Sequence, residues 1–434
     1  MGWYSMGLID NEKMEEYLSS ICCQISNLKI HSDIQEEVRG HIEEIALEYI
    51  EGGFSEDEAI NNALAQMGDA SLIGRELNKV HRQRPEWSIV ILASIFTLLG
   101  LSIIFLIDSI GILQYSLFSK SIICALVGFS LATFLYYFDY MKIKDYSKYL
   151  YLATTAVMLL TFIFGRTIDG KPYLFIGTTI NLIDVSPLLL TVSFAGILSQ
   201  LNWSETRQFA YVSILVIVPI ILMIASNSSS ALLTYCTSVI ILLISSGIKI
   251  KNILILMTSC LAAFILCLFK EPYYTQKFLF FLNTQGELAG SEFLKFQLDK
   301  LIHSAGILGQ VSTFDGIMPP EVHTDFIFTY IVYTFGWVAG VLLSLLVVLF
   351  LIRISTIAFY VKSSYGKLLI SGFTAIFSVQ FVWNILMNLG IAPITSMALP
   401  FISYGNSQFI INLAVVGLIS NIYKQKNRAI ETAT

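Results

Sequence analysis

Residues 87–107 read WSIVILASIFTLLGLSIIFLI, a run of 21 residues without a charged side chain. About 20 apolar residues in a helix cross the roughly 30 Å of hydrocarbon in a bilayer. The run therefore predicts a membrane-spanning helix. Because a polar segment that reads as folded comes before it, no cleavable signal peptide is expected and the span itself would direct insertion.

The rest of the chain repeats this pattern. Further apolar runs, long enough or nearly so to cross a membrane, begin near Ser121, Tyr149, Pro187, Phe209, Ala231, Asn252, Phe326, Lys367 and Phe409. The runs at Pro187 and Phe409 are short. The sequence thus predicts an all-α, polytopic membrane protein of about ten spans, with residues 87–425 as its membrane domain. Hydrophobic residues make up 55% of the chain and charged residues only 13%, too apolar for an ordinary soluble fold.

Positive charges set the predicted orientation, because cytoplasmic loops retain lysine and arginine. Alternate connections and the tail carry Lys142, Lys144, Lys148, Arg207, Lys249, Lys251, Arg353, Lys362, Lys367, Lys424, Lys426 and Arg428. Both termini are therefore expected on the cytoplasmic side of the membrane. Residues 271–325 then form the longest outside loop, and a loop of that length is more often functional than idle.

Residues 10–84 read as a separate, small, soluble helical domain. Met14, Leu18 and Ile21 recur at helical spacing, and Ser55 with Glu58 has the spacing of a capping box. Residues 1–86 hold 17 acidic and 7 basic residues, against 14 and 19 in the remainder. Neither part shows the clustered basic face that nucleic acid requires, so no nucleic-acid partner is expected.

The stretch FSEDEAINNALAQM, residues 54–67, with the GHIEEI at 40–45, resembles the HAAS-type prefix domain found ahead of some bacterial membrane proteins. The resemblance implies a cytoplasmic docking module for a regulator, for example a PadR-like protein. His31 and His41 lack cysteine or carboxylate at ligand spacing, so we predict no metal site.

The long loop ends in PPEVHTDF, residues 319–326, where an apolar run begins. One interpretation is structural: Thr324 or Asp325 caps the helix that follows, whose positive end favours a carboxylate. The other is functional, because an ionisable residue at the edge of a membrane core is costly and tends to mark a site. Such a carboxylate can accept a proton from a sugar hydroxyl.

A second cluster reads NILMNLG at 384–390, PIT at 393–395 and LPFISYG at 399–405. Proline and glycine interrupt the apolar run, which indicates irregular backbone dipping into the outer leaflet. Such backbone is tolerated only where it is buried in protein or lines a wet cavity. The alternative is a plain loop between the last two spans.

Both clusters closely resemble motifs of the SEDS family of bacterial cell-wall proteins, which includes FtsW, RodA and SpoVE. EVHTDFIF (321–328) resembles the family's E-x-H-T-D-F-I-F, and NLGIAPIT with LPFISYG resembles its N-x-G-x-x-P-x-T and P-L-P-F-I-S-Y-G. Weaker similarities are DGKPY at 169–173 and SAGILGQ at 304–310. The similarity covers essentially the whole chain after Trp87.

The resemblance implies polymerisation of lipid II into glycan, with Asp325 as the base that activates the attacking sugar hydroxyl. It also implies substrate-binding roles, here assigned to Glu321, His323, Thr324, Arg166, Lys171, Tyr173, Ser403 and Tyr404. No cofactor is required by the sequence, although a divalent cation is a candidate to share the neutralisation of pyrophosphate. The implied partners are undecaprenyl-diphosphate-linked glycan and a class B penicillin-binding protein.

Three family features are replaced in this chain. The family's E-E-L-G is Tyr333-Thr334-Phe335-Gly336, its P-S-E-L is Val185-Ser186-Pro187-Leu188 without a carboxylate, and its P-D-x-G-T is Ser228-Ser229-Ser230-Ala231. Two alternatives therefore stay open beside the glycosyltransferase. A lipid II flippase needs a polar path through the bilayer, and charges in the predicted spans are scarce. A catalytically silent scaffold or regulator would explain the lost motifs and the appended prefix.

Overall fold

The computed structural model describes residues 12–25, 31–81, 87–111, 116–168, 171–176, 178–180, 182–201, 206–270, 291–309, 319 and 321–426. The chain divides into two compact units, Met1–Arg84 and Pro85–Thr434. Of the long predicted loop 271–325, the segments 271–290 and 310–318 and residue 320 lie outside the described residues.

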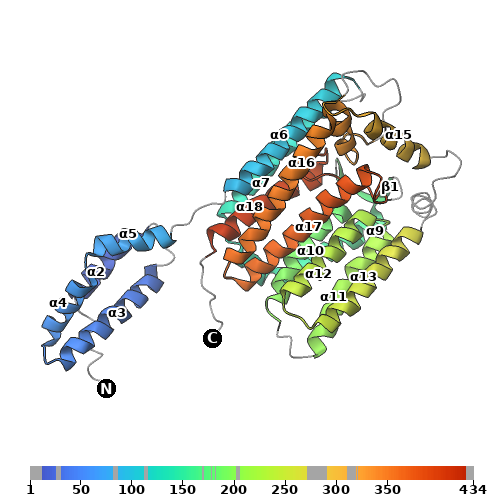
Figure 1. Ribbon diagram of the computed structural model, residues 1–434. Coiled ribbons are helices and arrows are strands. Elements are labelled where there is room, and N and C mark those ends of the chain that lie inside the picture. The colour runs from blue at the N-terminus through green and yellow to red at the C-terminus, as the bar shows by residue number, and fades with distance from the viewer. Residues whose placement is uncertain are drawn as a thin grey trace. The chain divides into compact units, whose positions relative to one another are not determined.

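The first unit is built from helices α2 (Glu12–Cys23), α3 (His31–Glu51), α4 (Glu56–Met67) and α5 (Ala70–His81), drawn in blue in Figure 1. The apolar positions at helical spacing face one core, in which Leu18, Ile21 and Ile42 are almost fully buried. The start of α4 is secured as its sequence predicts, because the Glu58 carboxylate accepts hydrogen bonds from the Ser55 backbone N–H (3.3 Å) and hydroxyl (2.8 Å). This unit therefore has its own core.

The second unit is a bundle of apolar helices (Figure 1). In chain order they are α6 (Trp87–Ser109), α7 (Phe118–Tyr137), α8 (Met141–Asp145), α9 (Ser147–Phe164), α10 (Leu182–Leu198), α11 (Thr206–Ala225), α12 (Ser229–Ser245), α13 (Ile250–Lys270), α15 (Ser291–Ser304), α16 (Ile327–Tyr360), α17 (Ser364–Asn388) and α18 (Asn406–Lys424). Every predicted apolar run forms one of these helices. Within the described residues, six helices are long and apolar enough to cross a membrane, and α10 and α12 are apolar but shorter.

These helices confirm the prediction of a helical multi-pass membrane protein, while the number of about ten spans stays a prediction. The sequence did not predict a small antiparallel sheet between α9 and α10. It consists of β1 (Arg166–Ile168), β2 (Lys171–Ile176) and β3 (Thr178–Ile180), in that order. Lys171, the first residue of β2, pairs with Ile168 in the β1–β2 register.

The segment between α17 and α18 is irregular backbone sealed inside the bundle. Leu399, Phe401 and Ile402 are almost fully buried. The Phe401 ring packs against rings from three helices, with centroids 5.5 Å from Phe350 and 5.4 Å from Phe377. The interpretation as buried, non-helical backbone is therefore confirmed, and the plain-loop alternative is wrong, because the aromatic core anchors this segment.

Helix α16 breaks near its start. Gly336 has non-helical angles (φ 85°, ψ 173°), so the helix consists of a short segment, 327–335, and a long one beyond it. At the break, the Trp337 and Val338 backbone N–H groups donate to the carbonyls of Gly306 and Ile307, at 3.2 Å each. These bonds satisfy donors that the broken helix leaves free and attach residues 306–307 to the start of the long segment of α16.

Candidate functional site

Asp325 lies in a tight turn that leads into α16. The Glu321 carbonyl accepts hydrogen bonds from the backbone N–H groups of Thr324 (3.0 Å) and Phe326 (3.3 Å). The helix-capping interpretation of Thr324 and Asp325 is wrong: Phe326 occupies the cap position of α16, and no side chain caps it. The Thr324 hydroxyl is instead directed back to the Glu321 carbonyl, at 3.1 Å. The Asp325 carboxylate is thus not engaged as a cap.

Two asparagines of α17 bind the backbone of this turn. The side-chain amides of Asn384 and Asn388 both donate to the Asp325 backbone carbonyl, at 3.0 Å each. The side-chain oxygen Oδ1 of Asn388 accepts from the Thr329 backbone N–H (3.2 Å) and hydroxyl (2.7 Å). Both asparagines are buried, and four residues apart on a helix they share a face. Their bonds fix the backbone from which the Asp325 side chain extends.

The segment 399–405 holds the turn from the other side. The Ser403 hydroxyl donates to the Thr324 carbonyl at 2.6 Å and accepts from the Leu399 N–H at 2.8 Å. The Tyr404 backbone N–H donates to the His323 carbonyl at 2.9 Å, and the rings of His323 and Tyr404 lie 5.8 Å apart. The structure therefore brings together the two motifs, which are about 80 residues apart in the sequence, in one hydrogen-bonded unit.

The carboxylate of Asp325 is buried, with 6% of the residue exposed. Its pKa is raised from the ordinary value of 3.8 to about 8. Burial is the largest cause, the charge of Glu321 adds to it, and Lys171 acts in the opposite direction. Burial also lowers the pKa of His323, so that its ring stays neutral near neutral pH. A carboxyl with such a pKa can accept and release a proton near pH 7.

Lys171 and a residue that the sequence analysis missed complete the charges around Asp325. The Lys171 ammonium lies 3.7 Å from the carboxylate of Asp184, in the first turn of α10. Both charges act on Asp325. One signal could have identified Asp184: it is an acidic residue at the start of an otherwise apolar helix, immediately before the position of the lost P-S-E-L motif.

Two other predicted substrate-binding residues lie on the sheet. Arg166 of β1 pairs with Tyr173 of β2 in the strand register. Arg166 is exposed and Tyr173 half-buried. Within the described residues, neither is among the groups whose charges act on Asp325. Both residues lie on the same sheet as Lys171.

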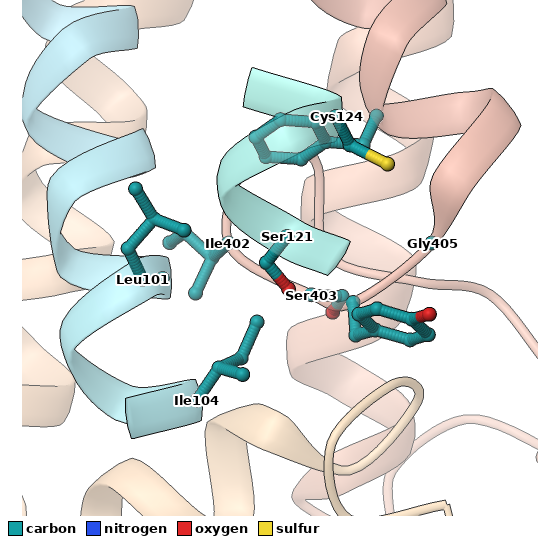
Figure 2. A pocket seen from close by; sticks show the side chains of 10 residues that line it. Leu101, Ile104, Ser121, Cys124, Ile402, Ser403 and Gly405 are labelled. Atoms are coloured by element: carbon teal, nitrogen blue, oxygen red, sulfur yellow. The ribbon is translucent and has the colours of Figure 1, made fainter. Parts of the chain in front are cut away.

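A mostly apolar recess lies beside the segment 399–405, which binds the Asp325 turn. Figure 2 shows it between Leu101 and Ile104 of α6, Ser121 and Cys124 of α7, and the Ile402–Ser403 backbone. Helix α6 packs closely against this segment, because a side chain at Gly100 would lie only 2.6 Å from the Ile402 carbonyl oxygen. The recess therefore borders Ser403, which also binds the Thr324 carbonyl of the Asp325 turn.

Comparison with known proteins places this arrangement in a family. A family model described as "Cell cycle protein", FtsW/RodA/SpoVE, matches residues 86–428. The chain belongs to this family. It is 26% identical over 310 residues to the probable peptidoglycan glycosyltransferase FtsW of Geobacter sp. strain M18, covering 69% of this chain and 84% of that protein.

Two solved structures share the FtsW/RodA/SpoVE fold. One is a chain from "Structural coordination of polymerization and crosslinking by a peptidoglycan synthase complex", with a TM-score of 0.67 at 21% identity, covering 80% of this chain and 99% of that one. The other is the rod shape determining protein RodA of Thermus thermophilus, with a TM-score of 0.61 at 20% identity and the same coverage. Both matches cover most of this chain, as expected if they correspond to its membrane unit.

Proposed function

We propose that this chain is a membrane glycosyltransferase that polymerises lipid II into the glycan strands of peptidoglycan. The observation that carries the proposal is the buried Asp325 carboxyl, raised in pKa and fixed at its backbone by both family motifs. The names of relatives, such as the probable peptidoglycan glycosyltransferase FtsW, support the same activity. Whether elongation, division or sporulation is served is a separate question.

In the proposed reaction, the 4-hydroxyl oxygen of one disaccharide attacks the anomeric carbon of a chain linked to undecaprenyl pyrophosphate. The new C–O bond forms as the bond from that carbon to pyrophosphate breaks, with inversion. Asp325 accepts the hydroxyl proton, and the electron pair of the broken bond leaves with pyrophosphate. A base with a pKa near the working pH suits this transfer.

The leaving pyrophosphate needs positive charge nearby. Lys171 is the cation that acts on Asp325, so we assign it to the pyrophosphate side of the site. Arg166 and Tyr173, on the same sheet, would contact more distant parts of the substrate. Glu321, His323 and Thr324 form the turn and Ser403 and Tyr404 bind it, and we assign the acceptor sugar to this side of the site.

A divalent cation is a further proposal. Within the described residues, no group of three or more histidine, cysteine, aspartate or glutamate side chains forms a ligand set. Mg²⁺ is commonly held by one or two carboxylates together with substrate phosphates. Such a cation would be held chiefly by the pyrophosphate oxygens of the substrate, and it would supply extra neutralisation of the leaving group.

Orientation and partners belong to the same proposal. The positive charges of the connections support an orientation with both termini in the cytoplasm and Asp325 outside, where the cell wall is built. A class B penicillin-binding protein would cross-link the product. The fold shared with a chain of a peptidoglycan synthase complex supports such a partner. The prefix, residues 10–84, would serve a cytoplasmic regulator.

The proposal is tested with purified full-length protein, with and without a class B penicillin-binding protein, on labelled lipid II with sizing of the product. Replacing a general base is expected to reduce the rate by a factor of about 10²–10⁴. Asp325→Asn should therefore make almost no glycan. Asp145→Asn, at an exposed position in α8, is the matched control and should polymerise normally.

Other outcomes would contradict the proposal. Asp325→Asn with the wild-type rate would remove Asp325 as the base. Transbilayer movement of lipid II without polymer would identify a flippase, and no glycan under any condition would leave a scaffold or regulator.

A further inference from the structure

A partly buried polar network surrounds Asp184 at the start of α10. One oxygen of its carboxylate lies 3.7 Å from the Lys171 ammonium. The other accepts a hydrogen bond from the Ser228 hydroxyl and one from the Ser230 hydroxyl at 3.4 Å. The side chain of Lys171 is 8% exposed and that of Asp184 22%. The network thus joins β2, α10 and the start of α12.

Each member has a physical reason to be there. A buried ammonium without a partner is strongly unfavourable, so Lys171 requires a nearby carboxylate. A carboxylate on a helix can rotate, but hydroxyls bound to one oxygen leave the other oxygen directed at the lysine. Ser228 and Ser230 lie at the start of α12, where the chain enters the helix. The serines therefore fix the Asp184 carboxylate, which in turn fixes Lys171.

The network acts on the site through charge. Within the part of the chain that the structure describes, the charged groups that act on Asp325 are Glu321 from its own turn, Lys171 from β2 and Asp184 from α10. Lys171 favours the ionised carboxylate, while Glu321 and Asp184 disfavour it. How much of the lysine's charge reaches Asp325 depends on how firmly Asp184 holds the ammonium.

We propose that Asp184, held by Ser228 and Ser230, is a positioning residue that places Lys171 between Asp325 and the leaving pyrophosphate. The proposal rests on the glycosyltransferase function. Asp184 precedes Pro187, the position of the missing family carboxylate, by three residues, so both lie on one face of α10. The serines occupy the position of the missing P-D-x-G-T. The chain's own Asp184–serine pairing thus takes over the place of both lost motifs, which argues against a silent scaffold.

The first test is the pH dependence of polymerisation by the full chain, with kcat and KM for lipid II measured separately. In Asp184→Asn, Lys171 loses its carboxylate partner and interacts more strongly with Asp325, while a negative neighbour of Asp325 disappears. The acidic limb of the rate profile should therefore move to lower pH by about one unit. The KM for lipid II should rise, because Lys171 is drawn away from the pyrophosphate. Asp184→Glu should restore the wild-type profile in part, and the Asp145→Asn control should match the wild type.

The second test does not depend on activity. The difference in melting temperature between Asp325→Asn and its parent is measured against pH, in the wild-type and Asp184→Asn backgrounds. This difference in melting temperature should become constant at a lower pH in the Asp184→Asn background, because the pKa of Asp325 is lower there. The double variant Ser228→Ala/Ser230→Ala should show a smaller shift in the same direction, and it replaces Asp184→Asn if that protein does not fold.

The outcomes separate the two proposals. If the wild type makes no glycan but the melting difference shifts, the proposed function fails and the positioning role of Asp184 stands. If the wild type polymerises and neither the rate profile nor the melting difference moves in any folded variant, Asp184 is a structural residue only and the inference is overturned.

Discussion

A single carboxyl, Asp325, carries a cost in stability that its position imposes. Its ordinary pKa of 3.8 is raised to about 8 in the folded chain, mainly by burial. Between these values the folded protein holds a proton that the unfolded chain has released. The contribution of Asp325 to stability is thus fully present below pH 4 and is lost as the pH rises through 8. The burial that raises the pKa of Asp325 and suits it to proton transfer therefore lowers the stability of the fold above pH 4.

Replacing Asp325 with asparagine should remove that cost. The side chain keeps its size and stays neutral. Above about pH 8 the free energy of unfolding of Asp325→Asn should therefore exceed that of the wild type by on the order of a few kcal/mol, and its melting temperature should be higher. The two proteins should converge towards pH 4. Melting curves across this range in one detergent provide the measurement. A wild type that equals or exceeds the variant at pH 9 would show that Asp325 is ionised without penalty.

At the scale of elements, the break in α16 matters because the short segment 327–335 follows directly on Asp325. Gly336 has φ +85°, and a side chain there would lie 2.3 Å from the Ile307 carbonyl oxygen. Residues 306–309 thus fit against the break only because Gly309 and Gly336 lack side chains. Residues 306–309, which follow α15, therefore pack against the helix segment that begins directly after the Asp325 turn.

Gly336→Ala should disturb that link. The positive φ and the close contact predict a loss of at least about 1–3 kcal/mol of stability. A shifted segment 327–335 should also reduce polymerisation, because Asp325 would leave its place relative to Lys171. Gly306→Ala is the control: its nearest neighbour would be 3.5 Å away and its φ is not positive. Equal melting temperatures and rates for the two variants would mean that the break tolerates a side chain.

Also at this scale, helices were predictable and their interactions were less so. Each apolar run became a helix because the period and length of such a run determine its structure in lipid. The capping interpretation of Asp325 was wrong, since local spacing cannot reveal that Asn384 and Asn388 hold the turn. Asp184 escaped notice because its partners, Lys171 and Ser228, come from other elements and meet it only in the fold.

At the scale of the whole molecule, the family motifs did what periodicity cannot. They predicted that residues 321–328 and 384–405 belong to one site, and the hydrogen bonds among them bear out that proximity. The sheet of β1–β3 was not predicted, because its strands are three to six residues long and follow directly on an apolar helix. The catalytic role of Asp325 stays a proposal for experiment.

The prefix offers a prediction about the chain as a whole. Residues 1–84 form a compact unit, and its described residues include an apolar core between helices α2–α5. Compact units that each have a core of their own are expected to contribute independently to stability and activity. Deleting residues 1–84 should therefore leave the melting temperature of the membrane unit and its rate on lipid II unchanged, while altering how activity is regulated in cells.

A point variant distinguishes loss of the prefix from shortening of the chain. Ile42 is fully buried in the prefix core, so Ile42→Asp should unfold that unit within the full-length protein. Both proteins should polymerise lipid II at the wild-type rate in vitro and share the same altered regulation in cells. If either one is well folded in its membrane unit yet inactive, the prefix takes part in catalysis, and its assignment as a docking module is wrong.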